Sequence, residues 1–246
     1  EQIQETRELI AKEKSIHAYC RTGNRCQKIW SASGVAESNE SSQSAPVLSG
    51  SAVTRRYDVV IVGGGSGGIA TAASLLKRRP ATRIAIIEPR STHDYQPGWT
   101  MVGGGVFEVD TTRRNIKQVM PDEVEWIQQS VTHFDVENNA VSLDNNEKVC
   151  YQQLIVAAGL KLNWEAVEGL AETLGKNGVT SNYLYELAPY TWELVRKLKQ
   201  GKAIFTQPPM PIKCAGAPQK ALYLSASHWL REGVLNNIDL DFYNAG

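Results

Sequence analysis

The sequence has few cysteines and no excess of charge of either sign. Its four cysteines, spread over 246 residues, are too few and too scattered for a disulfide scaffold. They suit a reducing compartment or a catalytic pair. Basic and acidic residues both number 26, so there is no basic bias toward nucleic acid or acidic membrane surfaces. No apolar run approaches the roughly 20 residues that a membrane-spanning helix needs.

The first part of the chain has few apolar residues that could enter a core. Residues 31–54 are rich in Ser and Ala, which is typical of a flexible leader or linker. Residues 15–36 carry basic residues and no acid, a composition seen in organelle transit segments, although acids precede them. His17, Cys20 and Cys26 lie close together, but a structural zinc site needs a fourth ligand and none is evident. We therefore expect a flexible leader over residues 1–54, with a possible targeting role and no metal.

The most informative stretch is an apolar run at 59–62 that ends in glycines. Gly63, Gly65 and Gly68 match the Gly-x-Gly-x-x-Gly pattern. In that pattern the first glycine allows a tight turn, the second lets the backbone approach a pyrophosphate, and the third lets a helix pack close to a strand. Residues 69–79 read as that helix, which ends before Pro80 and directs its N-terminal N–H groups at phosphates.

A second apolar run, residues 83–87, ends in Glu88, twenty positions after Gly68. An acid at that position can accept hydrogen bonds from a ribose hydroxyl. The glycine pattern alone is weak evidence, but strand, turn, helix, second strand and acid follow in order within one compact unit. The sequence therefore predicts an α/β, Rossmann-like dinucleotide site, and the residues leave open whether FAD or NAD binds there.

Further elements extend this α/β pattern through the rest of the chain. After Glu88 we expect a long polar and aromatic loop, then a helix over residues 110–118, and hairpin strands that turn at Asn145 and Asn146. The run 154–159 reads as a buried strand ending in small residues that let the chain pass close to a flat ligand. We place a nucleotide-binding domain at residues 55–168 and a second, incomplete Rossmann-like domain at residues 169–246.

The second domain repeats the order strand, loop, helix and strand, but its loop has a different composition. Strands are expected at 203–207 and 238–243, and a helix is expected from Pro218 to about residue 232. The loop at 208–217 contains three prolines and Cys214 instead of a glycine pattern. Because proline lacks the N–H that a phosphate cradle uses, we expect no nicotinamide cofactor in this domain.

Cys214 is the candidate redox residue. It lies next to Lys213 and just before a predicted helix N-terminus, two features that favour the thiolate form. Cys150 opens a predicted strand and has no comparable setting, so we interpret it as structural. No Cys-x4-Cys follows the first glycine pattern, which argues against the disulfide reductases built on this scaffold.

The glycine run Gly-Gly-Gly-Ser-Gly-Gly at 63–68 and Glu88 are followed by two further motifs, Tyr-Gln-Pro-x-Trp-Thr at 95–100 and Lys-Cys-Ala-Gly-Ala-Pro-Gln-Lys at 213–220. In these motifs the chain, from about Tyr57 onward, resembles the sulfide:quinone oxidoreductases, particularly the mitochondrial type. The last motif is the most specific. The Ala-Ala-Gly at 157–159 stands where related flavoproteins often have Ala-Thr-Gly.

The resemblance implies an FAD enzyme that oxidises hydrogen sulfide with two redox cysteines. Sulfide attacks a cysteine–sulfur bridge and leaves a persulfide, the electrons pass through FAD to ubiquinone, and the sulfur goes to a small acceptor such as glutathione or sulfite. Cys214 matches one of the two cysteines. Ser66, Gly67, Glu88 and Gln96 match flavin-binding positions, and Val131 matches the position where a strand offers backbone groups to the adenine. The other candidate cofactor-binding residues are Gly63, Gly65 and Gly68 of the glycine pattern and Gly159 at the end of the small-residue strand.

The same resemblance implies that the second redox cysteine, a second flavin-binding segment and membrane-attaching helices lie beyond Gly246. The chain then represents an N-terminal portion of an enzyme attached peripherally to the mitochondrial inner membrane, or to a bacterial membrane. Two alternatives stay open. One is another two-domain FAD enzyme, such as a type II NADH dehydrogenase, and the other is a truncated, non-catalytic FAD-binding product.

The leader should be dispensable for folding, because ordering residues that bury little apolar surface costs conformational entropy without compensation. Mild trypsin treatment, followed by mass spectrometry, should therefore cut within residues 1–54 before it cuts elsewhere. A chain starting at residue 55 should unfold at the same urea concentration as the whole chain. Protease resistance throughout the leader would contradict this prediction.

Overall fold

In the computed structural model, residues 16–18 and 55–245 are described. They form two compact units that alternate along the chain. The first unit contains residues 16–18, 55–93 and 115–160, and the second contains residues 94–114 and 161–245. The expected domain boundary near residue 168 stays a prediction, and most of the expected leader lies outside the described residues.

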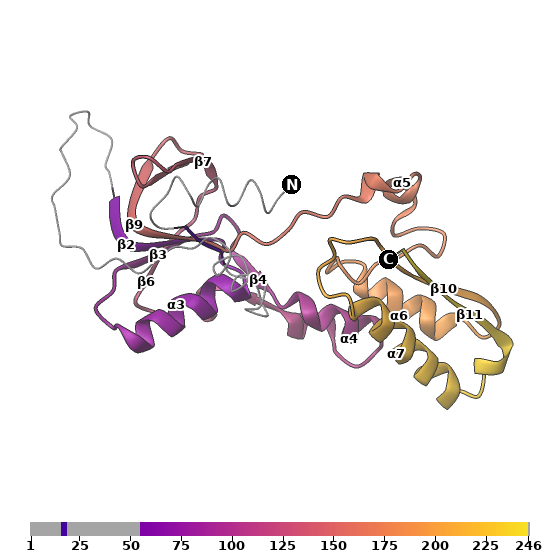
Figure 1. The fold of residues 1–246 in the computed structure, drawn as a ribbon. Helices are drawn as coiled ribbons and strands as arrows, with labels where there is room; N and C mark the ends of the chain where they lie inside the picture. The colour runs from indigo at the N-terminus through magenta and orange to yellow at the C-terminus, as the bar shows by residue number, and fades with distance from the viewer. Residues whose placement is uncertain (1–15, 19–54, 246) are drawn as a thin grey trace, which may run out of the picture. The chain divides into compact units, whose positions relative to one another are not determined.

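The first unit is built on a mixed, mainly parallel sheet (Figure 1). Its strands lie in the order β6 (Val124–Ile127), β3 (Ile84–Ile87), β2 (Arg55–Val62), β9 (Lys148–Val156), β8 (Ala140–Leu143) and β7 (Val131–Asp135). β2 pairs in parallel with both β3 and β9. The two predicted apolar runs are thus adjacent central strands, and the predicted α/β class is confirmed.

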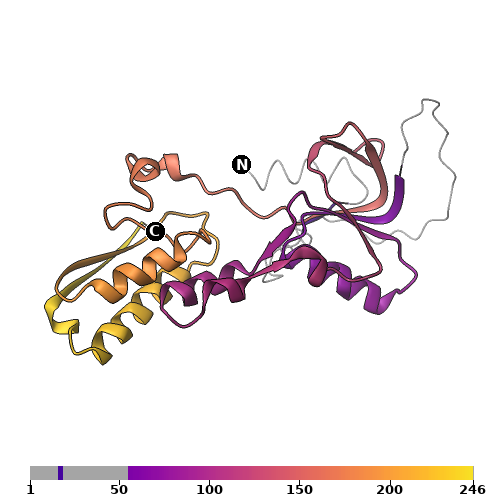
Figure 2. The same ribbon diagram turned by 180° about the vertical axis from the view of Figure 1, so that it is seen from behind.

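Apolar residues at consecutive positions of β2 and β3 let these strands bury both faces of the sheet. Val59 and Ile61 lie in one apolar cluster with Ala72 and Leu76 of helix α3 (Ser66–Arg78), which covers that face (Figure 2). Val60 and Val62 belong to a second cluster on the opposite face. Alternate residues of each strand therefore anchor the glycine turn from both sides.

Helix α3 begins at Ser66, three residues earlier than the sequence predicted. Two glycines in its first turn have low helix propensity, which is why the pattern alone favoured a later start. The close contact of Gly68 with the Gly63 carbonyl explains the presence of that glycine in the helix. The helix ends at Arg78, close to the predicted end.

The strand β9 joins two segments that the sequence separated. Its first part pairs antiparallel with β8, and Asn146 in the connecting turn has a φ of 65°, so the predicted hairpin is confirmed. Its last part, the predicted small-residue strand, pairs in parallel with β2. The strand β1 (Ile16–Ala18) pairs in parallel with residues 154–156 of β9. This strand is the only described part of the expected leader.

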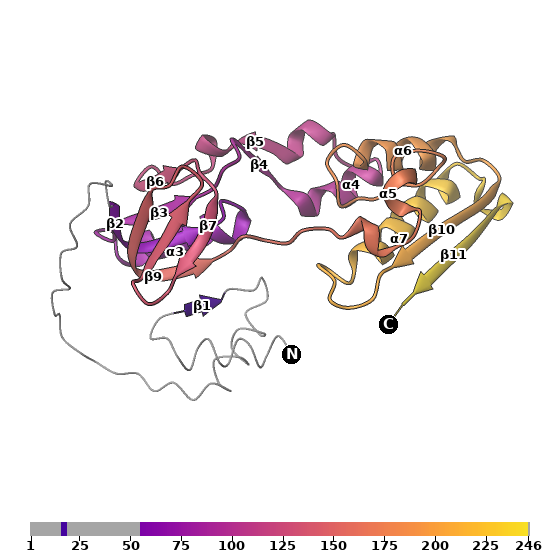
Figure 3. The ribbon, with the colours of Figure 1, turned by 90° about the horizontal axis from the view of Figure 1, so that it is seen from above.

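The second unit contains a separate pair of parallel strands, β10 (Gly201–Gln207) and β11 (Ile238–Asn244), which lie side by side (Figure 3). Helices α6 (Ala188–Lys197) and α7 (Ala217–Arg231) supply Val195 and Trp229 to a cluster with Ile238 of β11. The Trp229 indole donates a hydrogen bond of 2.8 Å to the Val195 carbonyl, so the buried indole N–H is satisfied. The predicted strands and helix of this half are confirmed.

The remaining elements are short. They are β4 (Thr92–Asp94), α4 (Trp99–Gly103), β5 (Arg113–Asn115) and α5 (Leu170–Thr173), with 3₁₀ turns at Gln96–Gly98, Val109–Thr112, Ile116–Gln118, Trp164–Ala166 and Leu235–Asn237. The segment expected as a loop after Glu88 thus contains α4, whose Trp99 and Val102 pack with Ala188. No helix in the described part of the chain has the length and apolarity to cross a bilayer.

The prediction of a helix over residues 110–118 is wrong, because this segment divides into two 3₁₀ turns and β5. Arg113 of β5 makes two hydrogen bonds, of 2.7 and 3.1 Å, to the Asp94 carboxylate. Its guanidinium also stacks 3.6 Å from the centroid of the Tyr185 ring, whose hydroxyl donates to Asp110. These long-range contacts, together with the pairing of β5 with β4, outweigh the helical spacing.

His228 of α7 is held against Trp192 of α6, with ring centroids 4.8 Å apart and planes inclined at 72°. Its Nε2 atom is buried without a hydrogen-bond partner among the described residues. Burial lowers the pKa of His228, Lys199 and Arg231 lower it further, and Glu232 acts in the opposite direction. The folded protein therefore binds this proton more weakly than the unfolded chain does.

This difference predicts that the protein loses stability in acid. The contribution of His228 is fully present above the unfolded histidine pKa of about 6.5 and is lost as the pH falls below it. His228→Phe keeps a ring against Trp192 but cannot titrate. Urea unfolding at about pH 7.5 and about pH 5.0 should show a larger loss of unfolding free energy for the wild type than for the variant. Equal losses would contradict the prediction.

Candidate functional site

The glycine turn after β2 is closed by two contacts that exclude a side chain. A Cβ at Gly63 would lie 2.4 Å from the Ala157 carbonyl oxygen, and Gly63 has a φ of 108°. A Cβ at Gly68 would lie only 2.0 Å from the Gly63 carbonyl oxygen. The first contact brings the ends of β2 and β9 together, and the second presses helix α3 against the turn. Both positions thus require glycine for reasons within the fold.

Gly65 and Gly67 differ, because a Cβ at either position would meet no atom within 4 Å. Gly65 is the N-cap residue of α3, where no side chain accepts a hydrogen bond from the first turn. The first turn also contains no acidic residue. This helix N-terminus therefore offers backbone N–H groups and a positive dipole end to an anion that approaches past an open backbone.

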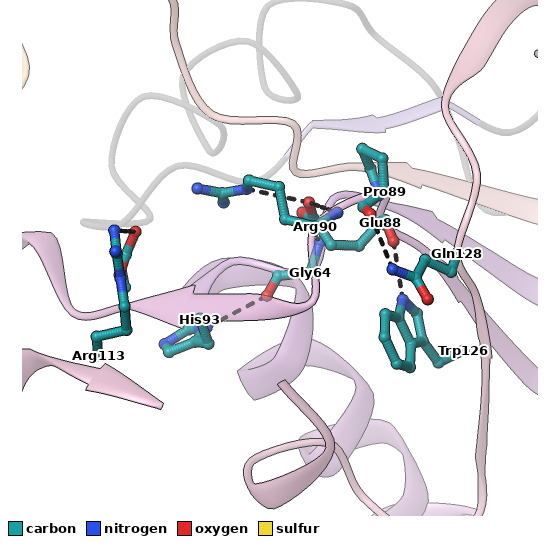
Figure 4. A network of polar contacts seen from close by, with 9 residues as sticks. Gly64, Glu88, Pro89, Arg90, His93, Arg113, Trp126 and Gln128 are labelled. Atoms are coloured by element: carbon teal, nitrogen blue, oxygen red, sulfur yellow. Dashed lines mark hydrogen bonds and ion pairs between the residues drawn. The ribbon is translucent and has the colours of Figure 1, made fainter. Parts of the chain in front are cut away.

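Glu88 lies at the carboxyl end of β3 and is 6 % exposed. Its carboxylate accepts hydrogen bonds of 2.9 Å from the Gly64 N–H and 3.0 Å from the Arg90 N–H, and the Arg90 guanidinium adds a contact of 3.2 Å (Figure 4). The Glu88 carbonyl accepts a hydrogen bond of 2.8 Å from the Trp126 indole N–H. The acid is thereby fixed beside the glycine turn, since Gly64 belongs to that turn.

His93 completes this network from the other side of the turn. Its Nδ1 lies 3.3 Å from the Gly64 carbonyl oxygen (Figure 4). Gly64 thus makes one polar contact through its N–H and another through its carbonyl, which fixes the peptide groups on both sides. A buried backbone held at both ends can present neighbouring N–H groups in one orientation.

Two further predicted residues lie in the same unit. Val131 begins β7, and its side chain packs against the apolar cluster that contains Ile87 and Ile127, next to the strand end that carries Glu88. Gly159 follows β9, with a φ of 79° and open space at its Cβ position. The first unit therefore contains all the predicted binding positions except Gln96.

Gln96 lies in the second unit, where it contacts the loop that carries Cys214. The Lys213 ammonium donates a hydrogen bond to the Gln96 side-chain oxygen. The Lys213 carbonyl accepts a hydrogen bond from the Tyr183 hydroxyl. The residue before the cysteine is thus held at its side chain and at its main chain.

Cys214 is exposed and has a φ of 63°, in the left-handed region that residues with side chains rarely adopt. Such a conformation costs about 1–3 kcal/mol and is found where surrounding contacts impose it. The Cys214 carbonyl accepts a hydrogen bond of 2.9 Å from the Ala217 N–H at the start of α7. Cys150, in contrast, is a half-buried residue of β9 paired with Ala140 and Arg56, which fits a structural role.

Several residues of these networks were not found from the sequence. Arg90 and Trp126 support Glu88, Gly64 binds its carboxylate, and Tyr183 holds the cysteine loop. Arg90 lies two residues from Glu88, so proximity in sequence gave a signal for it. Tyr183 lies 30 residues from Lys213, and no spacing pattern indicates that contact.

Comparison with known proteins gives relatives along most of the chain. The chain is 44 % identical over 190 residues to a protein of Dictyostelium discoideum named mitochondrial sulfide:quinone oxidoreductase, covering 76 % of this chain and 42 % of that protein. It is 38 % identical over 189 residues to the mouse protein of the same name, covering 77 % of this chain and 42 % of that protein. The chain thus spans less than half the length of these relatives.

A solved structure agrees with these sequence relatives. The sulfide:quinone oxidoreductase of the hyperthermophilic bacterium Aquifex aeolicus superposes with a TM-score of 0.64 at 25 % identity, over 77 % of this chain and 43 % of that one. A family profile described as pyridine nucleotide-disulphide oxidoreductase matches residues 57–205. This match includes the glycine turn, Glu88 and most of β10, and the chain belongs to the pyridine nucleotide-disulphide oxidoreductase family.

Proposed function

We propose that this chain carries the FAD-binding cradle, formed by residues 63–68 and Glu88, and one redox cysteine of a sulfide:quinone oxidoreductase. The observation that carries the proposal is its 38–44 % identity to two proteins of that name over about 190 residues. The geometry supports it independently, because an open glycine turn with a fixed acid and an exposed cysteine before a helix are both present. The chain spans 42 % of those relatives, so the whole reaction is part of the proposal.

The cradle of the first unit fits a dinucleotide. The pyrophosphate would lie against Gly65, Ser66 and Gly67, where the helix N-terminus is uncapped and the space beside both glycines is open. Glu88 would accept hydrogen bonds from a ribose hydroxyl, since each carboxylate oxygen can accept more than one. Val131 and Gly159 would border the adenine and the flat ring system. Gln96 is proposed as a further flavin contact.

Cys214 is proposed as the sulfide-handling residue. Hydrosulfide attacks one sulfur of the bridge between Cys214 and the second redox cysteine. The attacked cysteine keeps the new sulfur as a persulfide, and the other cysteine is released as a thiolate. A flavin held in the cradle would supply the two-electron transfer between this sulfur chemistry and ubiquinone.

The relatives also suggest partners and a location. Both are named mitochondrial, so we propose a mitochondrial protein that acts with hydrogen sulfide, ubiquinone and a small sulfur acceptor such as glutathione or sulfite. Peripheral attachment to the inner membrane is part of the same proposal. A type II NADH dehydrogenase is disfavoured, because the loop after β10 has prolines at 208, 209 and 211 where a second cradle would need N–H groups.

Binding of FAD can be tested at Gly65, because a methyl group there contacts no protein atom. Gly65→Ala should leave the urea midpoint unchanged but weaken FAD binding by roughly tenfold, about 1.4 kcal/mol, by blocking the approach of the pyrophosphate. Fluorescence titration with FAD measures this. Gly216→Ala is the matched control, since Gly216 is the N-cap of α7 and its Cβ position is equally open. A protein that gains no flavin spectrum when supplied with FAD would overturn the proposal.

The role of Cys214 can be tested by the flavin absorbance of an FAD-loaded protein of the relatives' full length. Cys214→Ser removes the soft nucleophile with little change in shape, so sulfide-dependent bleaching should be abolished while FAD stays bound. Cys150→Ser is the control and should bleach like the wild type, with a small loss of packing in β9. If the Cys214 variant bleached at the normal rate, the assignment of Cys214 would be wrong.

A further inference from the structure

The conformation of the Cys214 loop needs an explanation within the second unit. Cys214 is exposed and has a φ of 63°. A residue with a Cβ leaves the left-handed region unless the surrounding structure imposes it. The hydrogen bond from the Ala217 N–H to the Cys214 carbonyl lies on the C-terminal side of the cysteine. A restraint on the N-terminal side is therefore also required.

That restraint is provided by the contacts of Lys213. The Tyr183 hydroxyl donates to the Lys213 carbonyl, which is part of the peptide group that joins Lys213 to Cys214. The Lys213 side chain is bound at its far end by Gln96. A peptide group held by a hydrogen bond cannot rotate freely, and its orientation sets the ψ of Lys213 and limits the φ of Cys214.

Tyr183 is suited to act as a permanent donor. It is half-buried, and burial raises the pKa of Tyr183 while negative charge on Cys214 raises it further. The phenol therefore keeps its proton when the neighbouring cysteine is a thiolate. The donor that holds the loop persists in the state in which the cysteine is nucleophilic.

We propose that Tyr183 is a positioning residue for Cys214. Its hydroxyl fixes the Lys213–Cys214 peptide group and so holds the Cys214 backbone in the left-handed conformation, in which the residue is exposed. The inference rests on the proposed function, because the conformation of Cys214 matters for catalysis only if Cys214 handles sulfide. The geometric part concerns the second unit alone and can be tested without sulfide, quinone or flavin.

The first test uses Tyr183→Phe, which removes only the hydroxyl. Hydrogen exchange of a peptide that contains the Ala217 amide should become about tenfold faster, while exchange in β10 and β11 stays unchanged. Tyr190→Phe is the matched control. Its hydroxyl accepts a hydrogen bond of 3.1 Å from the Gly178 N–H, away from the cysteine loop, so its loss should leave the Ala217 amide as in the wild type. Unchanged exchange in Tyr183→Phe would overturn the proposal.

A rescue experiment distinguishes positioning from general support of the fold. Glycine adopts a positive φ without steric cost, so Cys214→Gly needs no restraint on that angle. In the Tyr183→Phe background, Cys214→Gly should restore most of the lost protection of the Ala217 amide. If Tyr183 merely stabilised the unit, the more flexible glycine would lower protection further, and that result would also overturn the proposal.

A functional measurement separates this inference from the proposed function. In the FAD-loaded, full-length protein, Tyr183→Phe should slow sulfide-dependent flavin bleaching about tenfold at saturating sulfide, whereas Tyr190→Phe should not. Normal bleaching in Cys214→Ser would overturn the proposed function and leave the exchange results valid. Faster exchange with normal bleaching in Tyr183→Phe would show that the loop is held by Tyr183 but that this orientation does not matter for the chemistry.

Discussion

The first unit depends on the close approach of three backbone segments around Gly63. The carbonyl of Ala157 and the first turn of α3 both come so near that neither Gly63 nor Gly68 has room for a Cβ. This contact joins the end of β2 to the end of β9 and sets the direction in which α3 leaves the turn. The buried apolar residues on both faces of β2 hold the strands in register and so maintain the approach.

The position of Glu88 follows from the same approach. Because β3 pairs in register with β2, Glu88, the residue that follows the strand, lies beside the Gly64 N–H, which donates a hydrogen bond of 2.9 Å to its carboxylate. The acid is therefore part of the turn's own hydrogen bonding as well as a candidate ligand contact. A carboxylate satisfied by two backbone N–H groups stays in place before any ligand arrives, which reduces the ordering that binding would require.

Local pattern explains which features could be predicted from the sequence. The apolar runs of β2, β3 and β9, the glycine turn and the strands of the second unit each depend on residues within a few positions, and their types were predicted correctly. The helix prediction at residues 110–118 was wrong because contacts that are distant in sequence decide the structure there. There the contacts of Arg113 with Asp94 and Tyr185 come from 19 and about 70 residues away, and they decide the local structure.

The candidate site likewise contains some features that depend on local sequence and others that depend on contacts distant in sequence. Gly65 and Glu88 could be proposed as binding residues because their positions, an open helix start and a strand end beside the turn, depend on spacing along one strand–turn–helix unit. The link from Gln96 to Lys213 spans 117 residues and the one from Tyr183 spans 30, so no period in the sequence reports them. Tyr183 and Gln96 contact the residue before Cys214, and such contacts leave no mark in a motif, because the motif consists of the cysteine and its immediate neighbours.

The interleaving of the two units has a consequence for dissecting the chain. Residues 94–114 belong with residues 161–245, and within that unit Trp99 and Val102 pack against Ala188. A fragment beginning near residue 169 would therefore expose Ala188, because it lacks Trp99 and Val102, although it would keep the cluster of Val195, Trp229 and Ile238. During synthesis, the segment that carries Trp99 must likewise wait unburied until some ninety further residues have left the ribosome. Separate expression of the second unit accordingly requires a circularly permuted or linked chain that keeps residues 94–114.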